Sequence, residues 1–152
     1  DLVTGVQTCA LPIWQIKILG MGGEFMTTIL AVDDSASMRS AVEYALVEKG
    51  GYDLSQAEDG EHALALINQH RTSVGKAFDL ILADINMPVM DGYEMVEEIR
   101  KMPDYRFTPI LFLTTENSAE AKQKGRELNA TGWINKPFSP EKLLGIVEQV
   151  LS

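Results

Sequence analysis

The sequence predicts an α/β domain with a mostly parallel sheet that helices cover on both faces. After residue 26, short β-rich apolar runs alternate about five times with amphipathic stretches, which is typical of strands that are each followed by a helix. Parallel strands require long right-handed crossovers, so the helices are expected on both faces of the sheet. With 152 residues, 45% of them hydrophobic, the chain suits one domain with a substantial core.

The expected elements follow in order along the chain. The strands are the apolar segments 28–33, 52–57, 78–84, 108–114 and 131–135. The helices fill the gaps at 36–49, 60–70, 92–101, 118–128 and 140–151. Helical spacing supports the first and the last helix, through the stripes Ala41, Tyr44, Ala45, Glu48 and Leu143, Leu144, Val147, Leu151.

The first 25 residues differ from the rest of the chain. The segment LPIWQIKILG has no clear helical or alternating period, and the Gly-rich MGGEF follows it. We therefore expect residues 1–25 to be an extension outside the domain, and residues 26–152 to form the domain.

The origin of this extension has three interpretations. A signal peptide is poorly supported, because the region before the apolar stretch begins with Asp1 and lacks Lys and Arg. The segment Val3 to Ile13 resembles a translated sequencing adaptor joined upstream of a natural start at Met26. In that case Cys9 and Trp14 have no biological role. A disordered extension is the third interpretation.

Composition excludes several classes of partner. A net charge of -9 and a pI near 4.6 give a surface that repels nucleic acid. No apolar run approaches the ~20 residues that a bilayer span needs, so no membrane insertion is expected. The single cysteine permits no internal disulfide, and we expect a cytoplasmic protein.

Acidic residues stand at the ends of two expected strands. Asp33 and Asp34 end the first strand, and Asp84 ends the third after an apolar run. In an open parallel sheet the carboxyl ends of the strands share one edge, where ligands bind. Three carboxylates that meet there would repel one another unless a cation neutralises them, and a hard site of few oxygen ligands suits Mg²⁺.

A hydroxyl and a cation stand at the ends of the other strands. Thr114 ends the fourth strand, and the fifth leads to Lys136, so both reach the same edge. A carboxylate nucleophile, a divalent ion, a lysine and a hydroxyl are the groups that in-line phosphoryl transfer requires. Each feature alone has an ordinary structural explanation. A pair of Asp residues after a strand is often a helix N-cap, and a Lys before Pro is often a solvated loop residue. The complete set favours a site in which Asp84 becomes phosphorylated.

Four segments carry a resemblance to a known family. The segments VDDSASM, LILADINMPVMDG, LFLTTE and WINKPF resemble the motifs of receiver domains in bacterial response regulators, in order and at fitting spacings from Thr27 to Ser152. The resemblance, and not the spacing, implies a flavodoxin-like (βα)5 sandwich with the parallel strand order 2-1-3-4-5.

The resemblance also implies roles at the metal site. Asp84 corresponds to the phosphoacceptor and Asp34 to a direct Mg²⁺ ligand. Asp33 corresponds to an acid that acts on the metal largely through water, and Asn86 to the residue whose backbone carbonyl binds it.

Further roles concern the response to phosphorylation. The resemblance implies that Lys136 pairs with the phosphoryl oxygens, that its bond to Pro137 is cis, and that Thr114 reorients toward the phosphoryl group. Movement of this Thr makes room in the family for an aromatic ring, here Trp133, where Tyr or Phe is usual. A rotamer switch and a half-buried packing role for Trp133 carry equal weight.

Two positions bear on the lifetime of the phosphoryl group. Asn86 and Glu116 resemble the pair found in chemotaxis receivers that lose phosphate quickly. Thr115 is bulkier than the Ala often found there, which would slow the access of water.

The resemblance is strongest to stand-alone CheY-like chemotaxis regulators. It implies a CheA-like histidine kinase as phosphodonor and a flagellar switch protein as target, contacted through the fourth helix, fifth strand and fifth helix; a phosphatase is a further possible partner. The last helical stripe ends at Leu151, so we expect output by protein contact. Phosphorelay and non-flagellar chemosensory receivers remain alternatives.

Two other classes of function are considered. A phosphatase of the haloacid-dehalogenase type also uses an Asp nucleophile with Mg²⁺, but needs an acid two residues later, where this chain has Asn86. A degenerate receiver that acts only as a binding module would lack part of the acid, Thr and Lys set, which is complete here. We therefore expect a signalling protein and no enzyme.

Other conspicuous residues have ordinary explanations. His62 and His70 are expected on solvated helix surface. Met87, Met90, Met95 and Met102 are expected to pack around the third helix.

Overall fold

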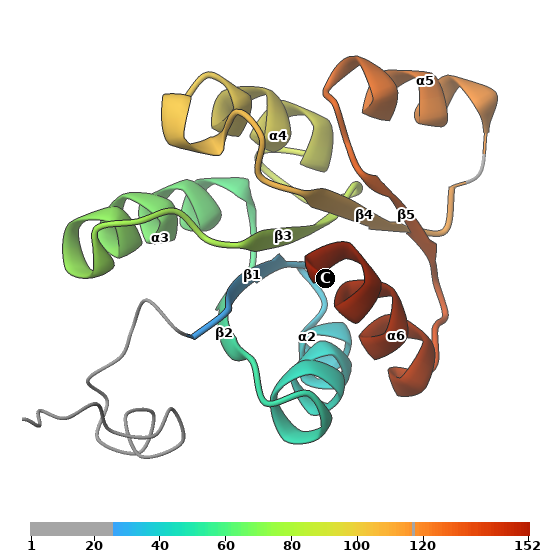
Figure 1. Ribbon diagram of the computed structural model, residues 1–152. Coiled ribbons are helices and arrows are strands. Elements are labelled where there is room, and N and C mark those ends of the chain that lie inside the picture. The colour runs from blue at the N-terminus through green and yellow to red at the C-terminus, as the bar shows by residue number, and fades with distance from the viewer. Residues whose placement is uncertain (1–25, 117) are drawn as a thin grey trace, which may run out of the picture.

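The computed structural model describes residues 26–116 and 118–152, in which five strands alternate with helices (Figure 1). The expectations for residues 1–25, including Cys9 and Trp14, lie outside the described residues. The strands are β1 (Thr28–Val32), β2 (Asp53–Ala57), β3 (Leu80–Asp84), β4 (Ile110–Thr114) and β5 (Gly132–Asn135). The helices are α2 (Ala36–Glu43), η2 (Tyr44–Lys49), α3 (Gly60–Val74), α4 (Gly92–Arg100), η3 (Pro103–Tyr105), α5 (Ala119–Glu127) and α6 (Pro140–Leu151).

The five strands form one parallel sheet in the order β2-β1-β3-β4-β5, which confirms the flavodoxin-like fold. Strand order reverses at β1, because the chain first adds β2 on one side of β1 and then β3 on the other. In open sheets of this kind, the crevice at such a reversal, beyond the carboxyl ends of the strands, is where ligands bind.

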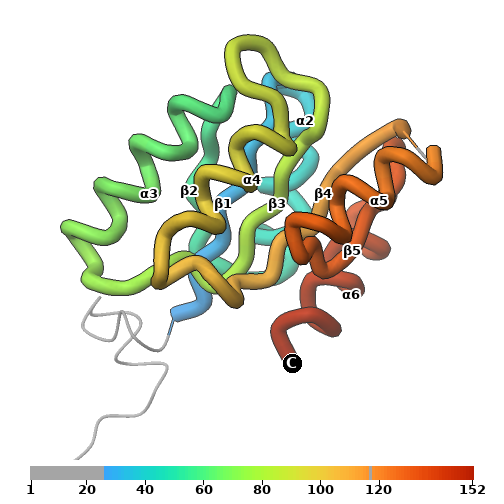
Figure 2. Tube along the Cα trace, turned by 90° about the horizontal axis from the view of Figure 1, so that it is seen from above, coloured from blue at the N-terminus to red at the C-terminus, as the bar shows by residue number. Residues whose placement is uncertain are grey.

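Helices cover both faces of the sheet and give the domain three layers. Helices α3, α4 and α5 lie on one face, and α2 and α6 on the other, as Figures 1 and 2 show. Alternate residues of β1 enter the two cores: Leu30 and Val32 face the α3–α5 side, and Ile29 and Ala31 face the α2–α6 side. Both faces of the central strands are therefore buried, as parallel sheets require.

The helices begin at side chains that accept hydrogen bonds from free backbone N–H groups of the first turn. At α4, Asp91 accepts from the Glu94 N–H while Glu94 accepts from the Asp91 N–H. The other N-caps are Ser35, Asp59, Ser118 and Ser139. These caps explain why the predicted helix starts lie within one residue of the observed ones.

The first helix differs from its prediction in one respect. It runs to Lys49 as expected, but its last six residues are π-helical. Val42, Ala45 and Leu46 are buried and Tyr44 is 45% exposed, so the stripe predicted through Tyr44 and Glu48 is wrong. The side chains that cover the sheet are instead these aliphatic residues, which are spaced three and four positions apart along the helix. The stripe predicted on α6 is confirmed, since Leu143 and Val147 are fully buried and Leu144 and Leu151 pack beside them.

Helix α3 extends past its predicted end at His70. It continues to Val74 and ends at Gly75, whose φ of 80° places it in the left-handed region that favours glycine. The His70 ring stacks on Phe78 with centroids 3.9 Å apart, so the prediction of a solvated His70 is wrong. Exposed His62 fits its prediction.

The four methionines pack around α4 as predicted. Met87 and Met95 are buried in the core on the α3–α5 side of the sheet, and Met90 and Met102 pack against that core. Met90 also touches α3, where a side chain on Gly60 would come within 2.8 Å of it.

Candidate functional site

Three carboxylates converge at the carboxyl edge of the sheet, as the sequence predicts. Asp33 directly follows β1, Asp34 follows it, and Asp84 ends β3. Carboxylate oxygens of the three residues lie within 4.8 Å of one another. Asp33 and Asp84 are 1% and 6% exposed, whereas Asp34 is open to solvent. The cluster therefore combines two buried carboxylates with one that is exposed to solvent.

Lys136 reaches the same cluster from the turn after β5. Its Nζ lies 2.8 Å from Oδ2 of Asp33 and 3.2 Å from Oδ1 of Asp84. The lysine side chain is 14% exposed, so these ion pairs are largely shielded from solvent. The lysine thus joins two acids on different strands and partly neutralises them.

The mutual proximity of these charges shifts their protonation. Burial raises the pKa of Asp84 to about 6, and the negative charge of Asp33 adds to this increase while Lys136 opposes it. Burial by itself would lower the pKa of Lys136. The hydrogen bond to Asp33 and the negative charges of Asp33 and Asp84 outweigh the effect of burial, so the pKa of Lys136 is raised. The lysine is therefore fully cationic at neutral pH.

Asp33 is held in place from several sides. Its Oδ1 accepts a hydrogen bond from the Ser35 N–H at 2.9 Å, and its Oδ2 accepts from Lys136. Its backbone carbonyl accepts from Nη1 of Arg39 at 2.7 Å. The sequence analysis did not identify Ser35 and Arg39 as part of the site. The signal that could have identified them is their position in the first turn after the Asp pair.

The donor set fits a magnesium ion. Carboxylate oxygens from three side chains are the hard ligands that Mg²⁺ prefers, and few protein ligands are usual because the ion keeps several waters. When bound, such an ion would offset the negative charge of the acids and of phosphoryl oxygens. Asp33, Asp34 and Asp84 are the residues that would hold it.

Thr114 lies on the neighbouring strand, at the same edge. It ends β4, is 1% exposed and stands in register with Asn135 of β5. Its Oγ1 accepts a hydrogen bond from the Glu116 N–H at 2.8 Å, which fixes the orientation of the hydroxyl at this edge of the sheet. Thr115 and Glu116 follow it on the surface. The predicted reorientation of Thr114 on phosphorylation stays a prediction.

The remaining predicted positions lie around the cluster. Asn86 is exposed in the loop after Asp84, and the bond between Lys136 and Pro137 is cis. Gly92, at the start of α4, is a further residue of the site: a Cβ there would overlap the carbonyl oxygen of Asp84. Glycine at this position lets α4 pack directly against the end of β3.

Trp133 is half-buried on the face of the sheet that carries α4 and α5. It stands in register with Phe112 and packs against the core on that side. This placement fits the packing role, while the rotamer switch stays a prediction.

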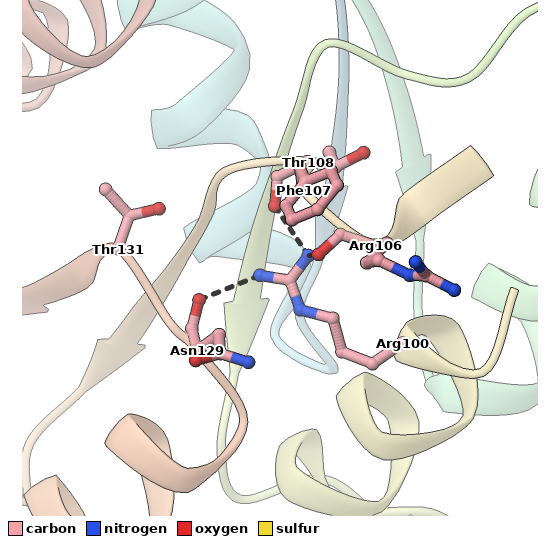
Figure 3. A pocket seen from close by; sticks show the side chains of 6 residues that line it. All are labelled: Arg100, Arg106, Phe107, Thr108, Asn129 and Thr131. Carbon is pink, nitrogen blue, oxygen red and sulfur yellow. Dashed lines mark hydrogen bonds between the residues drawn. The ribbon is translucent and has the colours of Figure 1, made fainter. Parts of the chain in front are cut away.

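A cavity of about 430 Å³ lies far from this cluster, at the opposite edge of the sheet (Figure 3). Arg100 lines this cavity, and its guanidinium donates to backbone carbonyls of Tyr105, Thr108 and Asn129 at 2.7 to 2.9 Å. The side chain of Arg106 points away from it. These guanidinium N–H groups already donate to backbone carbonyls of two loops. The role of Arg100 here is therefore to join those loops.

Comparison with known proteins agrees with this geometry. Residues 29–148 match the response regulator receiver domain. The chain belongs to the response regulator receiver family. Receiver domains are the phosphoacceptors of two-component signalling, in which a histidine kinase supplies the phosphoryl group, so this is a signalling domain.

Individual relatives show how far the likeness extends. The structure of the chemotaxis protein CheY4 of Vibrio cholerae is 48% identical, with a TM-score of 0.75, and the match covers 83% of this chain and 99% of that one. Protein PilG of Pseudomonas aeruginosa is 33% identical over 120 residues, 79% of this chain and 84% of PilG. Both matches extend over nearly the whole receiver.

Larger regulators also match. The probable transcriptional regulator ycf29 of Porphyra purpurea is 30% identical over 123 residues, which are 81% of this chain and 56% of that protein. The chain thus spans about half the length of this relative. Among the described residues of the receiver, no helix has the length and apolarity to span a membrane.

Proposed function

We propose that this receiver domain, residues 26–152, is a CheY-like chemotaxis regulator that a histidine kinase phosphorylates on Asp84. The observation that carries the proposed site is the position of Lys136, whose Nζ lies 2.8 Å from Asp33 and 3.2 Å from Asp84 within the three-carboxylate cluster. A buried nucleophile, a fixed cation and a hard-metal ligand set at one edge suit phosphoryl transfer to a carboxylate.

In the proposed reaction a carboxylate oxygen of Asp84 attacks the phosphorus of a phosphohistidine. The new O–P bond forms as the P–N bond to the kinase breaks, and the histidine nitrogen keeps the electron pair. Lys136 pairs with the phosphoryl oxygens in place of Asp84, and Thr114 turns its hydroxyl toward them. Mg²⁺ held by Asp33, Asp34, Asp84 and the carbonyl of Asn86 would offset the charge on these oxygens.

The chemotaxis assignment rests on similarity. The likeness to Vibrio cholerae CheY4 extends over 99% of that chain at 48% identity, which supports a stand-alone regulator. The proposal includes a cytoplasmic location, a CheA-like kinase and a flagellar switch protein as target, bound through α5, β5 and α6. Phosphorelay or non-flagellar chemosensory signalling is the alternative.

We propose a short-lived phosphoryl group, with Asn86, Thr115 and Glu116 as the residues that set its lifetime. All three are exposed in the loops that follow β3 and β4 at the carboxyl edge of the sheet, where they can affect the access of water to the phosphoryl group. Loss of phosphate within minutes after removal of acetyl phosphate would agree with this, whereas persistence for hours would contradict it.

Phosphoryl mapping tests the site directly. The protein is incubated with Mg²⁺ and acetyl phosphate, and the added phosphoryl group is located by mass spectrometry. We expect label on Asp84, none in Asp84→Asn, and normal labelling in Asp104→Asn, which changes an aspartate paired with Arg71 outside the cluster. Label on another residue, or label that survives in Asp84→Asn, would contradict the proposal.

Affinity capture tests the output. The receiver is immobilised with and without beryllofluoride and Mg²⁺, and a purified flagellar switch protein is added. Capture that increases with beryllofluoride supports the chemotaxis assignment. Equal capture in both states, or none, would favour phosphorelay or non-flagellar signalling.

A further inference from the structure

Two cavities adjoin each other on the surface that α4, α5 and the loop before β4 form. One, of about 420 Å³, lies between α4 and α5. The other is the cavity of about 430 Å³ that Arg100 lines. They meet where Nε of Arg100 donates to the backbone carbonyl of Leu128 at 3.0 Å, because Arg100 lines one cavity and Leu128 the other. We call the two cavities together the α4–α5 groove.

The half of the groove between the two helices is acidic. Its charged lining residues are Asp91, Glu94, Glu97, Glu127 and a single lysine, Lys124. Glu97 and Glu127 are exposed, and neither forms an ion pair with a lysine or arginine of the described residues. Tyr93 and Leu128 line the same cavity and supply apolar surface. This half therefore combines apolar surface with negative charge that has no cation paired to it.

The half of the groove at the loop before β4 carries an exposed aromatic ring and a cation. Phe107 is 87% exposed, more than any other large apolar side chain of the described residues. Arg106 precedes it, and its side chain points away from the cavity into solvent (Figure 3). Within residues 26–116 and 118–152, no carboxylate pairs with Arg106. This half therefore offers a phenyl ring and a free guanidinium.

The two halves of the groove are complementary to each other in charge. A twofold axis places the same patch of two copies face to face, so the basic half of each copy meets the acidic half of the other. The two halves adjoin on one surface, as such an arrangement requires. Two copies of a chain with a net charge of -9 repel each other in most orientations, whereas this orientation joins opposite charges.

We propose that the α4–α5 groove is the contact surface of a twofold dimer of this chain. Phe107 of each copy enters the cavity between α4 and α5 of the other copy, against Tyr93 and Leu128. Arg106 of each copy pairs with Glu97 of the other. None of the residues of the proposed phosphorylation site lines the groove, so the dimer does not rest on the proposed function.

Sedimentation velocity of the full chain measures this association. The concentration series extends to about 1 mM, and a reductant keeps Cys9 from forming a disulfide between chains. We expect a monomer–dimer equilibrium that added salt weakens, because ions screen the charge pairs. Phe107→Ser should raise the dissociation constant by about tenfold or more, since the buried ring is lost. A single monomeric species at every concentration overturns the inference.

A charge exchange identifies the contact surface. Arg106→Glu and Glu97→Arg are each expected to be monomeric alone, because like charges then meet at both equivalent contacts. An equal mixture of the two variants should form a heterodimer. One of its contacts joins the two exchanged charges, which are again opposite, and the other keeps the native pair of Arg106 with Glu97.

Lys142→Glu is the matched control for this exchange. It reverses an exposed charge on α6, outside the groove, and changes the net charge by the same amount as Arg106→Glu. Its dimerisation is expected to equal that of the unaltered chain. Dimers that persist in Arg106→Glu and in Glu97→Arg alone, or a mixture that stays monomeric, overturn the inference. Neither experiment involves phosphorylation, so failure of the dimer and failure of the proposed function are observed separately.

Discussion

Val89 has a backbone conformation that valine rarely adopts. Its φ is 70°, its side chain is 74% exposed, and the Met90 N–H donates to the Pro88 carbonyl at 2.7 Å across it, which closes a γ-turn. A β-branched residue is strained in this region, whereas glycine and asparagine tolerate it. The strain lies in the loop that follows Asp84.

We predict that Val89→Asn stabilises the protein by about 1 kcal/mol, because it relieves this backbone strain without loss of buried contacts. Urea unfolding measures the change. Val47→Asn is the control, since Val47 is also at the surface but lies in a helical segment, where the two residue types have similar propensities. Equal changes at both positions would show that residue 89 is not strained.

His70 makes stability depend on pH. Burial against Phe78 lowers its pKa below the ordinary value of 6.5, so the folded protein favours neutral imidazole. Above that value both states are neutral and His70 contributes no pH dependence. As the pH falls below it, the unfolded chain takes up the proton first, and stability is lost until the folded pKa is reached.

We predict that His70→Phe reduces the slope of unfolding free energy against pH below pH 6.5, because the stacked ring no longer titrates. A single proton accounts for at most about 1.4 kcal/mol per pH unit. Urea titrations at several pH values measure it, with His62→Phe on the exposed side of the same helix as control. A slope that His70→Phe leaves unchanged would contradict the assignment.

The residues of the site differ in how far sequence could reveal them. Asp33, Asp84, Thr114 and Lys136 were predictable, because each stands at a strand end and parallel strands bring those ends to one edge. Gly92 was not, because its importance depends on the close approach of the Asp84 carbonyl in the folded structure. A glycine at the first position of an expected helix was the available indication.

At the scale of elements, Arg100 at the end of α4 connects two loops. Its guanidinium donates to Tyr105 and Thr108 in the segment before β4, and to Leu128 and Asn129 in the segment before β5. Burial lowers its pKa without removing its charge, and carbonyl dipoles stabilise the cation. The loops that lead into β4 and β5 are therefore held relative to α4.

We predict that Arg100→Lys lowers the free energy of unfolding by about 2 kcal/mol, because an ammonium cannot reach carbonyls on both loops as the planar fork does. Arg106→Lys is the matched control and should change stability by less than about 0.5 kcal/mol, as its side chain points away from the loops. Guanidinium unfolding measures both. Equal effects would show that Arg100 has no special role.

Element boundaries were predictable where a local rule decides them. Helix starts follow from Ser and Asp caps, whose side chains act within one turn. The π-helical turns of η2, the short η3 and the late start of β3 were not predicted, because they depend on packing between segments distant in sequence. Strand order came from family resemblance, since alternation alone does not specify which strands are neighbours.

At the scale of the whole molecule, the carboxylate cluster couples metal binding to folding. Asp33 and Lys136 are 103 residues apart in sequence, so the site exists only in the folded chain. A ligand that binds only the folded state stabilises it, by about 2.7 kcal/mol at a hundredfold excess over its dissociation constant.

We predict that Mg²⁺ at such an excess raises the thermal unfolding midpoint relative to EDTA, because it relieves repulsion among the three acids. Scanning calorimetry measures the shift. Asp34→Asn, which alters an exposed ligand, should reduce the shift strongly, whereas Glu48→Gln, which alters an exposed acid on η2, should keep it. A shift that is the same in Asp34→Asn would place the ion elsewhere.

Lys136 follows the last strand of the sheet, and this order has a consequence during synthesis on the ribosome. A nascent chain that has not yet emerged past β5 already contains the three acids but lacks the cation that pairs with Asp33 and Asp84. Prematurely terminated fragments therefore lack the cation that partly neutralises Asp33 and Asp84, and on the proposed function we expect a histidine kinase to phosphorylate only the complete receiver.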